Sequence, residues 1–127
     1  GVISRFAAAI ASRGRVTIFG DGSQTRDFVY VGDVARANAM ALLSRRAGRG
    51  EAVNVATGRS VSLLSLAREM YAAAGAVPAF KFAAARSGDV RRSLADISLA
   101  GRLLGYAPRF GLQEGLDATM AALRNRS

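Results

Sequence analysis

Residues 16–31 constrain the fold more than any other stretch of the chain. Positions 16–19 (VTIF) form a β-branched and aromatic run, which is typical of a strand. The sequence GDGS at 20–23 is turn chemistry, because glycine supplies backbone conformations that other residues avoid. After Asp27, aromatic residues and valines alternate over 28–31. We therefore predict two strands, over 16–19 and 27–31, separated by a loop.

Helical and strand patterns alternate along the rest of the chain. Ser62 and Gly75 have the residue types that begin and end a helix, and Asp33 and Asp96 can each open one. We expect helices over 2–12, 33–46, 62–74, 96–104 and 112–123, a buried strand within AVNVATG at 52–58, a strand at 80–82 and a loop over 84–93. This order predicts one mixed α/β domain over residues 1–127, with connections long enough for parallel crossovers.

Composition excludes several classes of site. The 127 residues are 50% hydrophobic, enough for one real core, and contain neither cysteine nor histidine. Disulfides, thiolate metal sites and Ser-His or Cys-His nucleophiles are therefore excluded. No apolar stretch has the length of a membrane span and the N-terminus has no signal-peptide pattern, so we expect a cytoplasmic protein without a membrane partner. The chain begins at Gly1 and not at Met, and residues 2–11 have the pattern of an internal part of a domain. We therefore expect a fragment of a longer protein.

The formal net charge of +9 raises the question of an anionic partner. All basic residues except Lys81 are arginines, they are scattered, and alanine is abundant, as codon bias in a GC-rich genome would produce. The chain carries no RNA- or DNA-binding motif that we recognise. A stand-alone basic module for nucleic acid or another polyanion is thus an alternative with charge as its only support, and a scaffold that binds nothing is a third.

The predicted second strand would present one arginine beside two rings. In an extended strand Arg26, Phe28 and Tyr30 share a face, and Thr17 and Phe19 share one on the earlier strand. Arginine binds phosphate oxygens bidentately and rings stack, so this pattern suits a ligand with phosphates and a planar ring. On spacing alone, the same aromatic residues are more often core than ligand contacts. The GDGSQT turn lacks the third glycine of a dinucleotide fingerprint and the Gly-Lys-Ser/Thr of a P-loop.

Four segments together carry a resemblance to a known family. They are VTIFGDGSQTRDFVYVGDVARAN at 16–38, NVATGRSVSLLSLA at 54–67, RSGDVRRSLADISLAGRLLGYAP at 86–108 and FGLQEGL at 110–116. In this order they resemble the NAD-dependent epimerase/dehydratase family, extended short-chain dehydrogenases that act on nucleotide-diphosphate sugars. The resemblance is strongest to UDP-glucose 4-epimerase-like members. It implies the C-terminal, substrate-binding portion of a Rossmann-type enzyme, without the N-terminal NAD-binding domain.

The resemblance also implies a substrate site. Its residues are Thr17, Phe19, Arg26, Phe28, Arg86 and Asp89. Thr17 and Phe19 correspond to residues that contact the base, and Arg26 and Arg86 to arginines that bind the pyrophosphate. Asp89 corresponds to the carboxylate that accepts hydrogen bonds from ribose. The implied partner is a UDP- or dTDP-hexose. Arg26 and the Arg86-x-x-Asp89 loop are expected to converge.

The chain departs from the family in ways that matter for activity. Ser87 stands where proline is usual, which leaves the loop that presents Arg86 less constrained. The catalytic Tyr-x-x-x-Lys pair and the cofactor-binding glycine motif are both missing from the sequence. We therefore expect no catalytic residue and no bound cofactor in these 127 residues, with NAD serving the parent enzyme. We also expect Ala-rich surfaces at 6–11 and 83–85 to lie open and to promote self-association.

Overall fold

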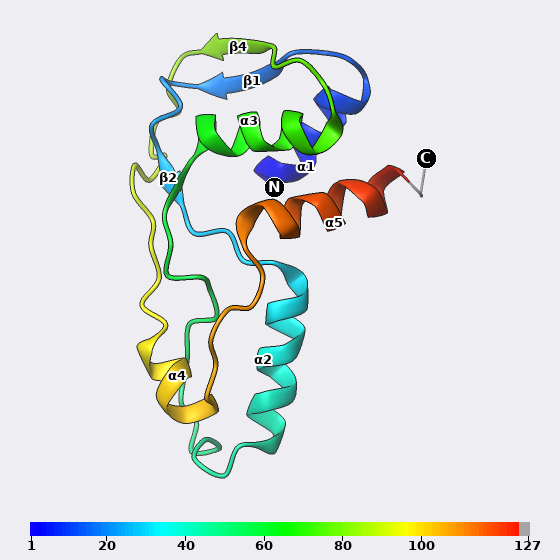
Figure 1. Cartoon of the computed structure of the whole chain (residues 1–127). Helices are drawn as coiled ribbons and strands as arrows, with labels where there is room; N and C mark the ends of the chain where they lie inside the picture. The colour runs from blue at the N-terminus through cyan, green and yellow to red at the C-terminus, as the bar shows by residue number, and fades with distance from the viewer. Residues whose placement is uncertain (125–127) are drawn as a thin grey trace.

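The computed structural model describes residues 1–124 as a small mixed α/β fold (Figure 1). Its described part contains five helices: α1 (Val2–Ala11), α2 (Val31–Leu43), α3 (Leu63–Ala74), α4 (Ser98–Leu104) and α5 (Leu112–Arg124). It contains four short strands: β1 (Val16–Phe19), β2 (Thr25–Arg26), β3 (Val61–Ser62) and β4 (Phe80–Ala83). β1 and β4 pair in parallel, and β2 and β3 pair antiparallel. The predicted fold class and parallel crossover are confirmed.

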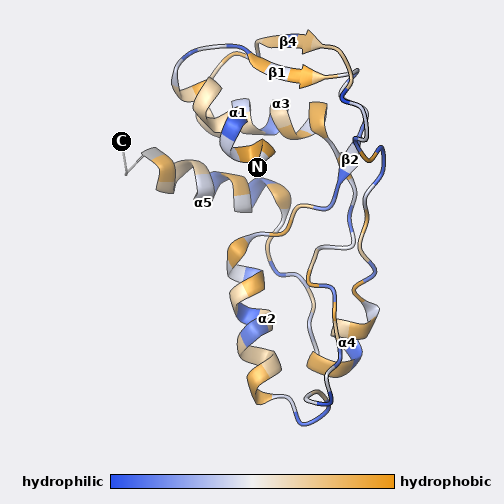
Figure 2. Cartoon of the chain, turned by 180° about the vertical axis from the view of Figure 1, so that it is seen from behind, coloured by the Kyte–Doolittle hydropathy of each residue, from blue (hydrophilic) through white to orange (hydrophobic). Residues whose placement is uncertain are grey.

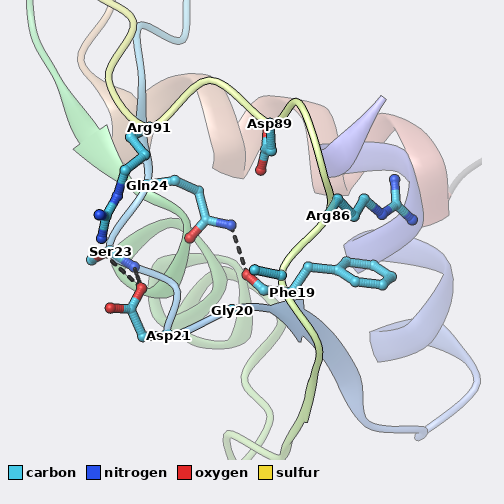
Figure 3. Close-up of a pocket in the computed structure, with 9 residues that line it drawn as sticks. Phe19, Gly20, Asp21, Ser23, Gln24, Arg86, Asp89 and Arg91 are labelled. Atoms are coloured by element: carbon cyan, nitrogen blue, oxygen red, sulfur yellow. Dashed lines mark hydrogen bonds between the residues drawn. The ribbon is translucent and has the colours of Figure 1, made fainter.

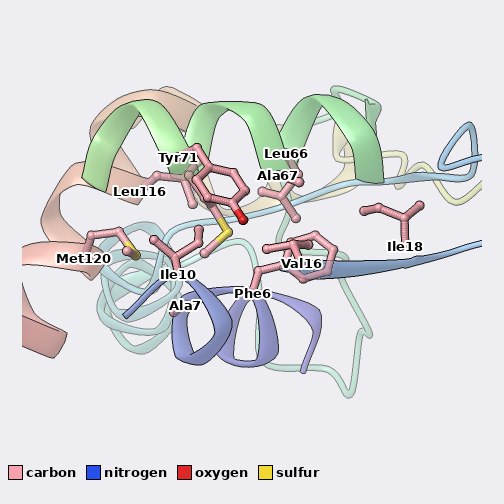
Figure 4. Close-up of a cluster of buried hydrophobic side chains, with 11 residues drawn as sticks. Phe6, Ala7, Ile10, Val16, Ile18, Leu66, Ala67, Tyr71, Leu116 and Met120 are labelled. Atoms are coloured by element: carbon pink, nitrogen blue, oxygen red, sulfur yellow. The ribbon is translucent and has the colours of Figure 1, made fainter. Parts of the chain in front are cut away.

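The main core lies beneath the β1–β4 pair. α1 and α3 pack under these strands, and α5 packs against α3 on the far side (Figure 1). Buried side chains from all these helices and from β1 meet there, as Figure 4 shows: Phe6, Ile10, Val16, Ile18, Leu66, Tyr71, Leu116 and Met120. Met70 of α3 belongs to the same cluster. This core holds the end of β1 and the start of α3 in place, and both border the candidate site.

A second, smaller cluster joins α2 and α4 away from the main core (Figure 2). Ala37 of α2, Ala100 of α4 and Tyr106 are buried together. The Tyr106 hydroxyl donates to the carbonyl oxygen of Ala56 at 2.8 Å. Burial, which is the largest influence, raises the pKa of Tyr106. The hydroxyl therefore acts here as a neutral hydrogen-bond donor.

Local signals predicted several elements correctly. The predicted strand over 16–19 is β1, and the predicted strand at 80–82 lies within β4. The hydroxyl of Ser62 accepts a hydrogen bond from the Ser65 backbone N–H at 3.1 Å and so caps α3. Gly75 ends the same helix with φ of 64°, a left-handed conformation that glycine adopts at little cost.

Three expectations about secondary structure were wrong. β2 ends at Arg26, residues 27–30 form no strand and α2 begins at Val31, so the predicted strand over 27–31 is absent. Asp33 lies inside the first turn of α2 and does not cap it, because its carboxylate is bonded to a distant loop instead. Residues 52–58 also form no strand. In each case the local pattern was compatible with another backbone arrangement that tertiary contacts favour.

The exposed apolar surface matches the expectation at 83–85, where Ala84 and Ala85 are exposed, but differs from it elsewhere. Phe6, Ala7 and Ile10 are buried in the main core, so the prediction of an open surface at 6–11 was wrong. Large exposed apolar side chains lie instead at the end of α2, where Leu42 and Leu43 are 88% and 83% exposed. None of the helices described in residues 1–124 is long and apolar enough to cross a membrane.

Candidate functional site

Two adjoining depressions lie where β1 ends, β2 begins and the loop after β4 passes over them. Their volumes are about 440 and 500 Å³. Four residues line both: Phe19, Gln24, Arg86 and Asp89. Because they share these residues, we treat the two depressions as one site, called here the Phe19–Asp89 cavity.

One wall of the cavity is a stacked ring and guanidinium. Phe19 is the last residue of β1, and the guanidinium carbon of Arg86 lies 3.8 Å from the centre of its ring (Figure 3). The Arg5 guanidinium also approaches this ring, at 5.9 Å. Cations are attracted to the face of an aromatic ring. The arrangement holds a flat apolar surface beside positive charge.

A second wall is the ion pair between β2 and the loop. Arg26 Nη2 donates to Asp89 Oδ1 at 2.5 Å. Arg26 Nη1 donates to the carbonyl oxygens of Thr25, at 2.7 Å, and Val90. The two charged side chains are 26% and 34% exposed. The guanidinium is therefore fixed in position at the cavity while remaining within reach of a ligand.

Backbone hydrogen bonds hold the loop over the cavity at both ends. At its start the Gly20 N–H donates to the Ala83 carbonyl at 2.9 Å. At its end the Thr25 N–H donates to the Arg91 carbonyl at 2.8 Å, and the Ser93 N–H donates to the Thr25 carbonyl at 3.1 Å. These bonds place Arg86 and Asp89 opposite β1 and β2.

The glycine turn between β1 and β2 forms the floor. Asp21 Oδ1 accepts from the hydroxyl of Ser23 at 2.6 Å and from its backbone N–H at 2.9 Å, and these bonds lower the pKa of Asp21 (Figure 3). Gln24 Nε2 donates to the Phe19 carbonyl at 2.7 Å. Gly22 has φ of 76°, and a Cβ there would lie 3.0 Å from side-chain carbons of Ile18 and Leu64. Only glycine fits this turn without displacement.

The structure brings together five of the six residues expected at the substrate site. Phe19, Arg26, Phe28, Arg86 and Asp89 all line the cavity, and Arg26 and Asp89 are in direct contact. The convergence of Arg26 with Arg86 and Asp89 was predicted from the resemblance.

Thr17 differs from the other five. It lies in the middle of β1, in register with Lys81 of β4, and contributes to neither depression. Sequence reasoning missed Gln24, Arg5 and Arg91, which also line the cavity. The position of Gln24 in the sequence, between the glycine turn and Arg26, was the signal that could have indicated a place at the site.

The glycine turn after β1 does not have the form of a dinucleotide-binding turn. A dinucleotide-binding turn leads from a strand into a helix, whose N-terminus holds the pyrophosphate. Here the glycine turn after β1 leads into β2. Within residues 1–124 no group of Asp and Glu side chains is arranged to hold a metal ion.

Comparison with known proteins shows what this chain is similar to. The model of the NAD-dependent epimerase/dehydratase family matches residues 1–56. The UDP-glucose 4-epimerase of Mycolicibacterium smegmatis is 39% identical over all 127 residues, which cover 40% of its length. The putative UDP-glucose 4-epimerase of Methanocaldococcus jannaschii is also 39% identical with the same coverage.

Solved structures agree. UDP-glucuronic acid 4-epimerase from Bacillus cereus, in complex with UDP-glucuronic acid and NAD, superposes with a TM-score of 0.92 at 30% identity, over 100% of this chain and 40% of that one. UDP-glucose 4-epimerase from Thermotoga maritima, with UDP-glucose, superposes with a TM-score of 0.91 at 36% identity, over 99% of this chain and 40% of that one.

The chain has a small mixed α/β fold, and its solved neighbours are Rossmann-type epimerases that match it over part of their length. Over residues 1–56 the chain matches the model of the NAD-dependent epimerase/dehydratase family, and over its whole length it is similar to UDP-sugar 4-epimerases. It spans about 40% of the length of the curated relatives that it matches.

Proposed function

We propose that this chain binds a nucleotide-diphosphate sugar, a UDP- or dTDP-hexose, in the Phe19–Asp89 cavity. It would serve as the C-terminal, substrate-binding portion of an NAD-dependent nucleotide-sugar epimerase or dehydratase, most like UDP-glucose 4-epimerase. The observation that carries the proposal is the convergence of Arg26, Arg86, Asp89 and Phe19 on one cavity. Relatives of both reaction types, including a dTDP-L-rhamnose 4-epimerase and a dTDP-glucose 4,6-dehydratase, match most of the chain.

The residues at the cavity suit the parts of such a ligand. Arg26 and Arg86 bring two guanidinium groups to the cavity, and guanidinium groups bind phosphate oxygens bidentately. Asp89 supplies acceptor oxygens for ribose hydroxyls, since only one of them is bonded to Arg26. The Phe19 ring offers a flat surface near the base. A diphosphate would also offset the local excess of positive charge.

Hydride transfer needs NAD and a proton-transferring tyrosine, which this chain does not supply. Its three tyrosines, Tyr30, Tyr71 and Tyr106, are not followed by lysine four residues later. NAD, when bound to the parent enzyme, accepts and returns the hydride. We propose that the residues here bind and orient the substrate only, so the isolated chain should neither bind NAD nor turn over UDP-glucose.

Calorimetric titration of the 127-residue chain tests the proposal. We expect saturable binding of UDP, dTDP or their glucose conjugates, and much weaker binding of uridine, because the arginines act on the diphosphate. NAD should give no saturable heat. Absence of nucleotide binding by a folded chain would contradict the proposal. If that chain instead bound duplex DNA with a steep loss of affinity in salt, the basic binding module would be the better account.

A further inference from the structure

The two arginines of the Phe19–Asp89 cavity are held in different ways. Arg26 donates hydrogen bonds to Asp89 Oδ1 and to two backbone carbonyl oxygens. Arg86 is exposed, and among the described residues 1–124 its guanidinium makes no hydrogen bond or ion pair. Its contact with the Phe19 ring is what holds it. Arg26 is therefore a fixed cation, whereas Arg86 can move without breaking a hydrogen bond.

Arg86 covers one face of the Phe19 ring. The guanidinium carbon lies 3.8 Å from the centre of the ring, which is contact distance for stacked carbon atoms (Figure 3). Both residues line both depressions, so this stack is part of the cavity wall. A guanidinium and a nucleotide base are both flat groups that stack on aromatic rings. A base can therefore occupy this face of Phe19 only after Arg86 has left it.

A diphosphate is the group that would draw Arg86 away from the ring. A guanidinium binds phosphate oxygens through two parallel charge-assisted hydrogen bonds, which are stronger than an exposed contact between a cation and a ring. Arg26 and Arg86 line the same depression, so a diphosphate bound at the fixed arginine shares the cavity with the movable one. A Cβ at Gly88, two residues further along, would meet no atom within 4 Å. The loop therefore has room to shift with Arg86.

We infer that Arg86 selects nucleotides over nucleosides by covering the Phe19 ring until a diphosphate draws it away. The inference rests on the proposed function and adds a coupling between the two ends of the ligand. A nucleoside has to displace the guanidinium without gaining a bond to it. A nucleoside diphosphate gains the bonds to Arg86 and the uncovered ring together. Arg86 is thus a specificity-determining residue with opposite effects on the two ligands.

One substitution tests this inference through two ligands. In Arg86→Ala the ring is uncovered, so uridine should bind about 2 to 5 times more tightly than it binds the wild-type chain, the factor that an exposed cation–π contact corresponds to. UDP should bind about 10 times more weakly or worse, because its bonds to the guanidinium are lost. NMR titration of the 127-residue chain measures both dissociation constants. Arg68→Ala, at an exposed position of α3, is the control and should leave both unchanged.

The position of Arg86 can also be followed in the wild-type chain. Protons that lie over the face of an aromatic ring resonate upfield of their usual position, so side-chain protons of Arg86 should be shifted upfield while it covers Phe19. UDP should move these resonances back towards their usual position. Inorganic pyrophosphate should do the same, because the phosphate groups alone draw the guanidinium away.

The contrary results separate this inference from the proposed function. If UDP binds but the Arg86 protons stay upfield, the base stacks elsewhere and the inference is overturned. It is also overturned if Arg86→Ala weakens UDP binding but leaves uridine binding unchanged, weaker or too weak to measure. In both cases the proposed function stands. If the folded wild-type chain binds neither UDP nor UDP-glucose, the proposed function and the inference fall together.

Discussion

At the scale of single residues, Asp33 shows how one buried carboxylate can organise distant segments. Its side chain has 0% exposure and accepts from the backbone N–H groups of Arg109 at 2.9 Å and Phe110 at 3.1 Å, and from Arg36 Nη2 at 2.9 Å. Burial alone would raise the pKa of Asp33, but these hydrogen bonds together outweigh it and lower the pKa. The carboxylate therefore stays charged and ties the start of α2 to the segment before α5.

Replacing Asp33 by Asn should destabilise the fold. The amide keeps the size of the side chain but removes the charge and turns one acceptor into a donor that faces other donors. We expect a loss of about 3 kcal/mol in the free energy of unfolding, the range for breaking a buried charged pair. Urea denaturation followed by circular dichroism measures it. Asp117→Asn, at an exposed position of α5, is the control, and an equal effect of the two changes would contradict the account.

The lowered pKa of Asp33 also predicts a pH dependence. A carboxyl group whose pKa is lower in the folded state stabilises the fold above its unfolded pKa of about 4. This stabilisation is lost as the pH falls from that value through the folded pKa. Between about pH 5 and about pH 2, the unfolding free energy of the wild-type chain should therefore fall more steeply than that of the Asp33→Asn variant. Parallel curves of unfolding free energy against pH would show that Asp33 is not the group responsible.

The two arginines of the cavity should matter for binding and not for folding. Arg26→Ala and Arg86→Ala should each weaken UDP-glucose binding by about 1.5 to 3 kcal/mol, the range for hydrogen bonds to charged groups. Helix content should survive both changes. Arg68→Ala, on an exposed position of α3, is the matched control. If either cavity variant unfolded while affinity per folded molecule was unchanged, that arginine would have a structural role instead.

At the scale of elements, the turn between β1 and β2 needs glycine for two separable reasons. Gly22 and Gly88 both have φ of 76°, but only at Gly22 would a Cβ contact packed neighbours. Alanine at Gly88 should therefore cost about 1 kcal/mol of backbone strain, and alanine at Gly22 about 2 to 4 kcal/mol. Thermal unfolding of both variants measures the difference. Equal losses would mean that the neighbours of Gly22 yield without cost.

The elements that sequence predicted correctly are those that local signals specify. Ser62 and Gly75 begin and end α3 through bonds and conformations within a few residues, and β1 is a short apolar run. The elements that were missed depend on distant partners. The role of Asp33 is set by a loop 76 residues away, and residues 52–55 find no strand to pair with among residues 1–124.

The site was predictable to a similar extent. Family resemblance identified Arg26, Arg86 and Asp89, but residue types and spacing alone left Phe19 and Phe28 as either core or cavity. Their place became clear only when the loop after β4 was seen to close over β1 and β2. The hydrogen bond from Gln24 to the Phe19 carbonyl depends on the path of the turn, which no local pattern specifies.

At the scale of the whole molecule, exposed apolar side chains predict self-association. Leu42 and Leu43 at the end of α2 are largely exposed, and so are Val77, Phe82, Val90 and Leu94. Such surface tends to be covered by another chain when it is contiguous. We expect the sedimentation coefficient to rise as the protein concentration increases about a hundredfold. The double variant Leu42→Gln, Leu43→Gln should reduce that rise. A constant monomeric coefficient would show that the surface is tolerated.

The central claim is that the Phe19–Asp89 cavity binds a nucleotide-diphosphate sugar. Chemical-shift mapping of the isotope-labelled chain, titrated with UDP-glucose, tests it most directly. We predict saturable shifts concentrated at residues 19–28 and 85–91, with the amides of α5 and of the end of α2 unchanged. No saturable shift in a folded chain, or shifts centred away from Arg26 and Asp89, would contradict the claim.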